Sequence, residues 1–392
     1  MLLSPEHEAF RRTLAGFVDR EVVPYAAEWD RAEAMDRSIV GRLASVGAFG
    51  ITIGEAYGGG GGDYQAYVLM MEELGRGDSS VRGIVSVSLG LFGKSVLRHG
   101  TEEQRRRWLP RICGGESLGC FALTEPDNGS DPASLRASAV RDGADWVLTG
   151  SKMFITNGTW ADVALVFART GGPGAKGITA FLVPTGTPGF AATPVTGKLG
   201  LRAQSTAQLT LDQVRVGDDA RLGAEGAGFT VAMTALDYGR MAVAAGCVGI
   251  ARAALEAATA YAGQREQFGR RIAGFQLVQE LLADMAVETD AARLLVWRAA
   301  ALADAAAGRP EGHRDSGELV ALAASKAKLY ASEVAVRAAN SALQVLGGYG
   351  YVDEYPVGKY VRDARVMTLY EGTSQIQRLI IGRALTGVSA FT

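Results

Sequence analysis

The sequence contains few of the side chains that form disulfides or bind metal ions. Its 392 residues include three cysteines, Cys113, Cys120 and Cys247, and three histidines. Three cysteines are too few for a disulfide framework and have no metal-ligand spacing, which is typical of a protein from the reducing cytoplasm. The histidines lie far apart and form no H-x-x-x-H pair, so a zinc site or a Ser-His-Asp system has no support. An enzyme made from this chain would have to use carboxylate bases or a cofactor, and we expect no metal site.

The chain also lacks a strong charge of either sign and a long apolar run. Its 40 basic and 42 acidic residues leave a net charge of -2, which gives no electrostatic argument for a nucleic-acid partner. The N-terminal residues Met1 to His7 carry charge too early for a secretory signal. No uninterrupted apolar run approaches the roughly 18 residues that cross a bilayer. We therefore expect a soluble, cytoplasmic protein without a membrane span.

The hydrophobic periodicity changes twice along the chain. It is helical from Ser4 to about Arg111, of β type between about Cys120 and Val216, and helical again from Phe229. This helix–strand–helix order predicts three domains, over residues 1–119, 120–228 and 229–392. The clearest strands are expected over 146–149, 163–167, 178–183 and 208–212. The clearest long helices are expected over 241–261, 276–302 and 318–346, with a polar loop over 308–316 between the last two.

A carboxylate stands in a turn near the C-terminus, within Leu369 to Ile380. Glu371 precedes Gly372, and Ser374 followed by Gln377 has the spacing of a capping box, which predicts that a helix begins at Ser374. Apolar neighbours would raise the pKa of such a carboxyl group and suit it to accept a proton. The commoner use of an acid at this position is to favour the helix dipole. Taken alone, the motif favours that second interpretation.

Four further segments, in register along nearly the whole chain, resemble motifs of the acyl-CoA dehydrogenase family. They are Cys120 to Asp131, with Thr-Glu-Pro and Gly-Ser-Asp, Ser151 to Gly158, Tyr261 to Met285, and Gln344 to Gly350. Short-chain members look most similar, through the first of these segments and through residues 236–240. The resemblance implies an α+β fold with an N-terminal all-α domain, a central β-barrel or sandwich, and a C-terminal four-helix bundle.

The resemblance also implies FAD as the cofactor. In the family, Arg265, Phe268 and Gln276 reach the FAD of a neighbouring subunit, which implies a homo-oligomer, typically a tetramer. Most members carry tryptophan where Phe154 stands, and phenylalanine keeps the aromatic wall without the indole N–H. The cofactor-binding residues implied in this way are Phe121, Ala122, Leu123, Thr124, Gly129, Ser130, Phe154, Ile155, Thr156, Arg265, Phe268, Gln276, Gln344, Gly347, Gly348, Thr373 and Gln375.

The reaction that the resemblance implies is α,β-dehydrogenation of a short-chain acyl-CoA to the 2-enoyl thioester. Glu371 would remove the α proton while the β hydride passes to flavin N5, and an electron-transfer flavoprotein would take the electrons onward. Some members place the base directly before Arg240, but this chain has Gly239 there, which leaves Glu371 as the candidate. The implied substrate-binding residues are Ser130, Asp237, Arg240, Gly372 and Arg82. A surface helical i,i+3 pair is the alternative for Asp237 and Arg240.

Arg82 departs from the short-chain pattern. Arg82 and Ser86 match a pair with which glutaryl-CoA dehydrogenases hold a distal carboxylate, although Gly75 stands where those enzymes carry a further acid. The commoner alternative is an arginine on a solvated helix surface. Three other functions stay open: a dehydrogenase for acyl groups bound to a carrier protein, a flavin oxidase or monooxygenase, and a non-catalytic helical scaffold.

Overall fold

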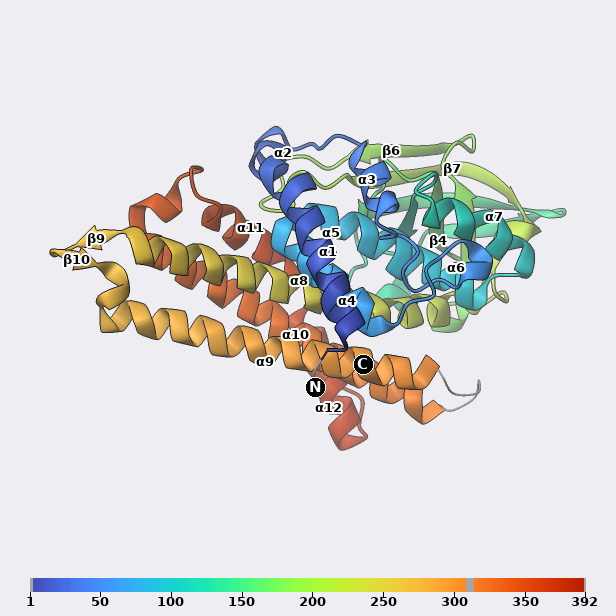
Figure 1. Ribbon diagram of the computed structural model, residues 1–392. Coiled ribbons are helices and arrows are strands. Elements are labelled where there is room, and N and C mark those ends of the chain that lie inside the picture. Colours follow the sequence, from blue (N-terminus) through green and yellow to red (C-terminus); the bar gives the residue numbers. More distant parts are fainter. Residues whose placement is uncertain (1–2, 308–313, 391–392) are drawn as a thin grey trace.

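The computed structural model describes residues 3–307 and 314–390 and shows a helical N-terminal part, a β part and a bundle of long helices (Figure 1). Side chains that stand at the starts of several N-terminal helices, including Ser4, Asp63 and Asp78, accept hydrogen bonds from backbone N–H groups there. The N-terminal helices are α1 (Pro5–Glu21), α2 (Ala26–Ala32), α3 (Ile39–Ser45), α4 (Tyr64–Gly77), α5 (Ser79–Val85), α6 (Lys94–His99) and α7 (Glu102–Cys113). A π-helix, η3 (Ser86–Gly93), joins α5 to α6.

The central part is one mixed sheet of eight strands in the order β6-β7-β3-β2-β4-β5-β8, with β1 beside β4. Its two halves meet at a single parallel pair, Ser138 with Arg169, and share one buried cluster in which Trp146 and Phe181 are in ring contact. The halves therefore close over a common core. The strands are β1 (Gly119–Ala122), β2 (Ser138–Asp142), β3 (Asp145–Thr156), β4 (Val163–Arg169), β5 (Ile178–Pro184), β6 (Phe190–Pro194), β7 (Thr206–Gly217) and β8 (Arg221–Leu222).

All four predicted strands lie inside observed ones, while β1, β2, β6 and β8 were not predicted. β6 is largely exposed and β8 has two residues, so neither carries an apolar run. The C-terminal part consists of α8 (Gly228–Gln264), a hairpin of β9 (Glu266–Gln267) and β10 (Arg270–Arg271), α9 (Gln276–Ala307), α10 (Arg314–Leu346), α11 (Val357–Met367) and α12 (Ser374–Thr386). α10 begins inside the predicted polar loop, whose residues 308–313 lie outside the described ranges. The proposed domain bounds stay a prediction.

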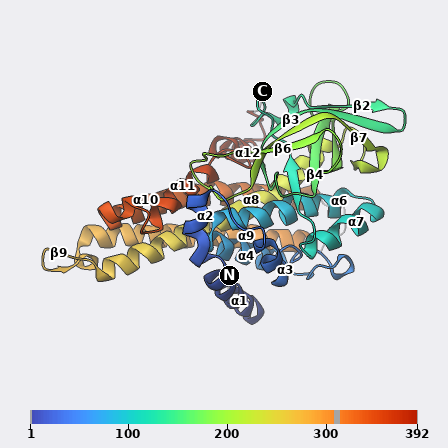
Figure 2. The ribbon, with the colours of Figure 1, turned by 90° about the horizontal axis from the view of Figure 1, so that it is seen from above.

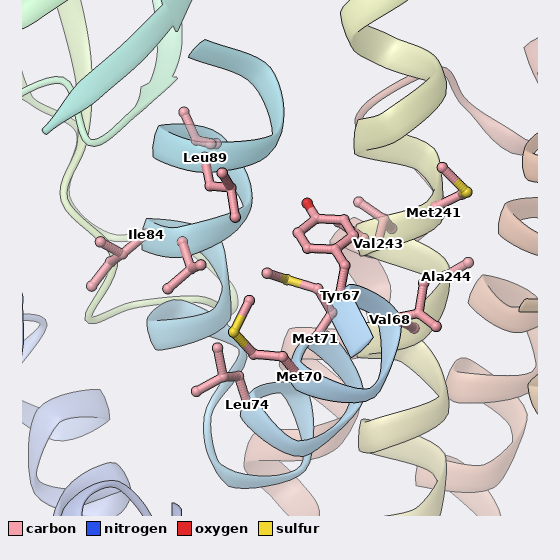
Figure 3. Packing of buried hydrophobic residues seen from close by; sticks show 14 of the residues in the cluster. Tyr67, Val68, Met70, Met71, Leu74, Ile84, Leu89, Met241, Val243 and Ala244 are labelled. Carbon is pink, nitrogen blue, oxygen red and sulfur yellow. The ribbon is translucent and has the colours of Figure 1, made fainter. Parts of the chain in front are cut away.

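Helix α4 and helix α8 touch through their backbones. A Cβ atom on Gly75 would lie 2.6 Å from Gly246, and one on Gly249 would lie 2.2 Å from the Glu72 carbonyl oxygen. Figure 3 shows side chains of the two helices interleaving beside the chain of α5 and η3, with Tyr67 on α4 close to Val243 on α8. This contact fixes the N-terminal helices against the bundle, and α12 packs on α10 on another side of it (Figure 2).

Two helices are long and apolar enough, by length and composition alone, to cross a bilayer. They are Ser79–His99, which runs through α5, η3 and α6, and Gly228–Gln264, which is α8. Of their apolar windows, 89% and 78% are buried inside the protein. The sequence prediction rested on uninterrupted apolar runs and did not identify them, but their place in the core accounts for their composition. The cytoplasmic location stays a prediction.

Candidate active site

The turn between α11 and α12 holds Glu371 in an unusual backbone conformation. Its φ is 51°, and that of Gly372 is 88°. Left-handed backbone is uncommon for a residue with a side chain and is concentrated at functional sites. The buried Gln377 donates from Nε2 to the carbonyl oxygens of Glu371 and Gly372, both at 3.1 Å. Nζ of Lys328, on α10, donates to the Gly372 oxygen at 2.7 Å. The side chains of Gln377 and Lys328 therefore hold the turn through its carbonyl oxygens.

The start of α12 differs in one respect from the sequence prediction. The helix begins at Ser374, as predicted, but the residue that caps it is Thr373. The Thr373 hydroxyl oxygen accepts from the backbone N–H of Ile376 at 3.2 Å. The Ser374 hydroxyl instead donates to Glu333 on α10 at 2.7 Å, because Ser374 is buried and faces that helix. The predicted capping box was therefore wrong by one residue.

The carboxylate of Glu371 faces Gly239 on α8. A Cβ atom added to Gly239 would lie 2.0 Å from Oε2 of Glu371 and 2.8 Å from Cδ2 of Leu91 on η3. Oε2 is inaccessible to solvent and has no hydrogen-bond partner among the described residues, although the residue as a whole keeps some exposure. Glycine at position 239 thus leaves the space in which this carboxylate lies.

Burial raises the pKa of Glu371 to about 7. The positive charges of Arg82, Lys328 and Arg240 oppose this shift, in that order of size. A carboxyl group with a pKa near neutrality can both take and release a proton at neutral pH, which suits a general base. The expected rise in the pKa of this group is confirmed, and burial is its cause.

Arg82 lies beside this carboxylate and is not on a solvated surface. It is 1% exposed, and its Nη2 donates to the Tyr370 hydroxyl at 2.5 Å. The aliphatic part of the Arg82 side chain passes over Gly246, where an added Cβ would lie 2.5 Å from Cδ of Arg82. Within residues 3–307 and 314–390 it forms no ion pair, and the hydroxyl of the buried Ser86 has no hydrogen-bond partner. The alternative of a solvated arginine was therefore wrong.

The pair Asp237–Arg240 occupies the same turn of α8 as Gly239. Arg240 Nη1 lies 2.7 Å from Asp237 Oδ1, and Arg240 is 6% exposed. Burial raises the pKa of Asp237, although the charge of Arg240 opposes this. The pair is therefore largely desolvated and differs from the exposed surface pair that was the alternative.

The predicted flavin residues near Thr124 and Phe154 lie side by side. The backbone N–H of Met153 donates to the Thr124 carbonyl oxygen at 2.9 Å, which places the end of β3 along the segment after β1. Phe154 sits at an irregularity in the pairing of β3 with β7, with φ of 60° and 62% of its surface exposed. The side chains of Ala122 and Ile155 are buried in the β core and offer only their backbone. Gly129 and Ser130 are exposed in the loop that follows.

Three further predicted cofactor residues, Arg265, Gly347 and Gly348, line a cavity of about 680 Å³ at the C-terminal end of α8. Arg265 stacks its guanidinium over Tyr349 at 5.6 Å, and Gly347 and Gly348 border the cavity with open space where a Cβ would be. Phe268, in the β9–β10 hairpin at the left of Figure 1, is 93% exposed. Gln276 begins α9 just after the hairpin, Gln344 lies three residues before Gly347 near the end of α10, and both are exposed.

This second group of predicted cofactor residues lies far along α8 from the turn that holds Glu371. Gly239, which faces Glu371, and Arg265 are separated along α8 by about 39 Å, at 1.5 Å per residue. Thr373 and Gln375, at the start of α12, belong with Glu371 and are far from the hairpin (Figure 1).

The sequence reasoning missed three residues of the site: Lys328, Gln377, and Tyr67, whose buried hydroxyl group interacts with the charge of Glu371. Lys328 had a recognisable signal: it stands on one helical face with Ala324, Ala331 and Ala335, all 0% exposed. A lysine in such a stripe is buried. Tyr67 had no comparable signal, since an aromatic residue on an apolar face is expected in a core. The described residues contain no cluster of three or more potential metal ligands.

Comparison with known proteins shows which family the chain resembles. Three family models match in order: the N-terminal domain of acyl-CoA dehydrogenase over residues 4–116, the middle domain over 120–214 and the C-terminal domain over 226–386. The chain is 41% identical over 380 residues to a mitochondrial short-chain specific acyl-CoA dehydrogenase of Bos taurus, covering 97% of this chain and 90% of that protein.

Two solved structures are similar over the whole length. Butyryl-CoA dehydrogenase from Megasphaera elsdenii is 38% identical, with a TM-score of 0.93 and coverage of 98% of this chain and 99% of that one. A glutaryl-CoA dehydrogenase from Mycobacterium smegmatis in complex with FADH2 is 38% identical, with a TM-score of 0.92 and coverage of 100% and 97%. The predicted three-domain fold is confirmed by these matches. This chain, an oxidoreductase by its relatives, belongs to the acyl-CoA dehydrogenase family.

Proposed function

We propose that the protein is an FAD-dependent dehydrogenase of short-chain acyl-CoA thioesters and that Glu371 is its base. The observation that carries the proposal is the Glu371 carboxylate, whose inaccessible Oε2 faces the space left by Gly239 and whose pKa is about 7. The short-chain specific relative and the butyryl-CoA dehydrogenase support the substrate class.

The residues of this chain would act on the α carbon of the thioester. Glu371 takes the α proton, and its backbone N–H donates to the thioester carbonyl, which favours the enolate-like charge. The cations Arg82, Lys328 and Arg240 favour the carboxylate that begins the step, and the bound acyl chain excludes water from it. When bound, FAD would supply the acceptor for the β hydride.

The residues present fit FAD if two subunits contribute to each site. The exposed ring of Phe154 and the backbone around Thr124 offer a flat surface on one side, and the cavity with Arg265 and the open glycines offers room for a pyrophosphate on the other. Because Arg265 lies about 39 Å along α8 from Gly239 and the Glu371 carboxylate beside it, the second set would serve a neighbour's cofactor. We therefore propose a homo-oligomer, a tetramer as in the family.

Replacing Arg265 with glutamine is expected to weaken FAD binding about tenfold or more, because a charge-assisted bond to phosphate is lost. FAD affinity is measured by reconstituting the apoprotein and following the quenching of flavin fluorescence. Arg271→Gln, an exposed arginine of the same hairpin, is the control and should bind FAD normally. Unchanged affinity in Arg265→Gln would show that Arg265 lies on a solvated face.

The proposed function is tested by anaerobic titration with a panel of thioesters while flavin absorbance is followed. Butyryl-CoA should bleach the flavin, and butyryl-pantetheinyl carrier protein, assayed beside it, should do so far less well. Hydrogen peroxide formation in air would indicate an oxidase instead, and a colourless protein that takes up no flavin would contradict the proposal. Reoxidation by an electron-transfer flavoprotein tests the proposed acceptor.

A second candidate substrate, a dicarboxylic acyl-CoA such as glutaryl-CoA, is favoured by Arg82. The buried guanidinium of Arg82 forms no direct ion pair among the described residues, and nearby Glu371 is only partly ionised near pH 7, so a ligand carboxylate would add a counter-charge. The hydroxyl of Ser86, four residues on and also without a partner in the described chain, would be a second donor. Arg82 also favours ionised Glu371, which is its alternative role.

Replacing Arg82 with leucine separates these roles. If Arg82 holds a distal carboxylate, kcat/KM for glutaryl-CoA should fall ~100-fold more than that for butyryl-CoA, because a buried charge pair is lost only with the former. Arg106→Leu, an exposed arginine on α7, is the control and should change neither value. Equal losses on both thioesters would restrict Arg82 to its effect on Glu371.

A further inference from the structure

Lys328 is a buried lysine of α10 in direct contact with the turn that carries Glu371. It is 0% exposed, and its neighbours on the same face of α10 are alanines. Among the described residues, its ammonium donates a hydrogen bond to the Gly372 carbonyl oxygen, at 2.7 Å. Burying a lysine is costly, so a lysine kept at this position points to a role for its charge.

The charges around Glu371 come from three helices. Arg82 on α5, Arg240 on α8 and Lys328 on α10 each favour the carboxylate, while Tyr67 on α4 and Tyr370 in the turn bring hydroxyl groups. Lys328 itself faces Cys247, Glu371, Arg240 and Glu333. Burial lowers the pKa of Lys328 to about 8, so its ammonium is mostly charged at neutral pH.

Lys328 differs from the two arginines in that it binds the backbone of the turn as well as acting on the charge of Glu371. Arg82 and Arg240 donate to side chains, the Tyr370 hydroxyl in the same turn and the Asp237 carboxylate on α8. Lys328 donates to the backbone of the residue next to Glu371, at a point where φ is left-handed on both residues. Gln377 donates to the same carbonyl but carries no charge.

We propose that Lys328 is a positioning residue for the base: its ammonium fixes the Glu371–Gly372 turn and, at the same time, favours the carboxylate form of Glu371. This inference rests on the proposed function in that it assigns Glu371 the role of base. Lys328 exchanges no proton with the substrate in this role. It holds the Glu371 carboxylate in the space beside Gly239, in the ionised form that can accept a proton.

The test is the titration of the Glu371 carboxyl group in the FAD-loaded protein, with and without Lys328. The C=O stretching band of protonated Glu371 is identified by infrared difference against Glu371→Gln and followed from pH 5 to 9. In Lys328→Met this band should persist to higher pH than in the wild type. The rate of flavin reduction by butyryl-CoA should fall about tenfold or more at pH 7 and recover in part as the pH rises.

Lys326→Met, which removes a less buried lysine of the same helix, is the matched control and should leave the midpoint unchanged. A purely structural role predicts a slower Lys328→Met enzyme with an unshifted midpoint, and that result would overturn the proposal. If Lys328→Met does not fold, Lys328→Arg decides: with the charge kept, the midpoint should stay near the wild-type value while the rate falls, and a raised midpoint contradicts the charge role.

The experiments distinguish a failure of the proposed function from a failure of the role proposed for Lys328. The carboxyl titration requires no substrate, so it reports on Lys328 even if no thioester bleaches the flavin. Conversely, bleaching by butyryl-CoA in the wild type with an unshifted titration in Lys328→Met leaves the proposed function intact and removes the role of Lys328.

Discussion

Glu371→Gln is expected to reduce thioester-driven flavin bleaching by several orders of magnitude. Glutamine has nearly the same shape as glutamate but cannot accept the α proton, and a positioned base contributes on the order of 10²–10⁴-fold by itself. The measurement is the anaerobic stopped-flow rate of flavin reduction by butyryl-CoA. FAD content and thioester affinity should be unchanged, because the backbone of the turn is held by Lys328 and Gln377.

Glu280→Gln, an exposed glutamate on α9, is the control and should reduce flavin at the wild-type rate. Near-normal bleaching in Glu371→Gln would contradict its assignment as the base. In the wild type the rate should rise as pH increases through about 7, where the Glu371 carboxyl loses its proton. The glutamine variant should lack this dependence.

The same pKa predicts an effect on stability with a defined sign. The ordinary pKa of the carboxyl is 4.5, and it is raised to about 7 in the folded protein. Between these values the folded protein keeps a proton that the unfolded chain has released, so the contribution of Glu371 to stability falls as pH rises through this window and is least favourable above pH 7. Glu371→Gln should therefore unfold at a higher temperature than the wild type at pH 8.

Moving the carboxylate to α8 is the second change with a large expected effect. Glu371→Gly should be as inactive as Glu371→Gln. Adding Gly239→Glu should raise the rate of flavin reduction at least about tenfold above that of Glu371→Gly. The reason is geometric: a Cβ on residue 239 would lie 2.0 Å from the present position of Oε2, so a base on α8 projects into the same space. Recovery should be partial, because the new carboxylate extends beyond that point.

The matched control is Gly239→Gln with Glu371→Gly, which fills the same volume without a base and should recover nothing. Gly239→Glu alone should be impaired more than tenfold, because its side chain collides with Glu371 and brings two carboxylates together. A double variant no faster than Glu371→Gly would show that the space beside Gly239 is not where the proton is taken.

Local pattern was sufficient for much of the fold. The alternation of apolar residues predicted strands inside β3, β4, β5 and β7, and the helical period predicted the three long C-terminal helices. Strand β6 was missed because it is mostly exposed, and α8 begins earlier than predicted because its first turns pack against β5 through Gly228. Register between strands and contacts between helices join residues far apart in the chain, so no local pattern contains them.

The order of helical and β segments, the family resemblance and the candidate base follow from the residues read along the chain. The environment of that base does not: Gly239 opposite the carboxylate, the buried Arg82, and Lys328 bound to the turn are visible only in the folded protein. This is because a pKa depends on burial and on charges brought close by folding. The groups around Glu371 lie on α5, α8 and α10, which only tertiary packing assembles.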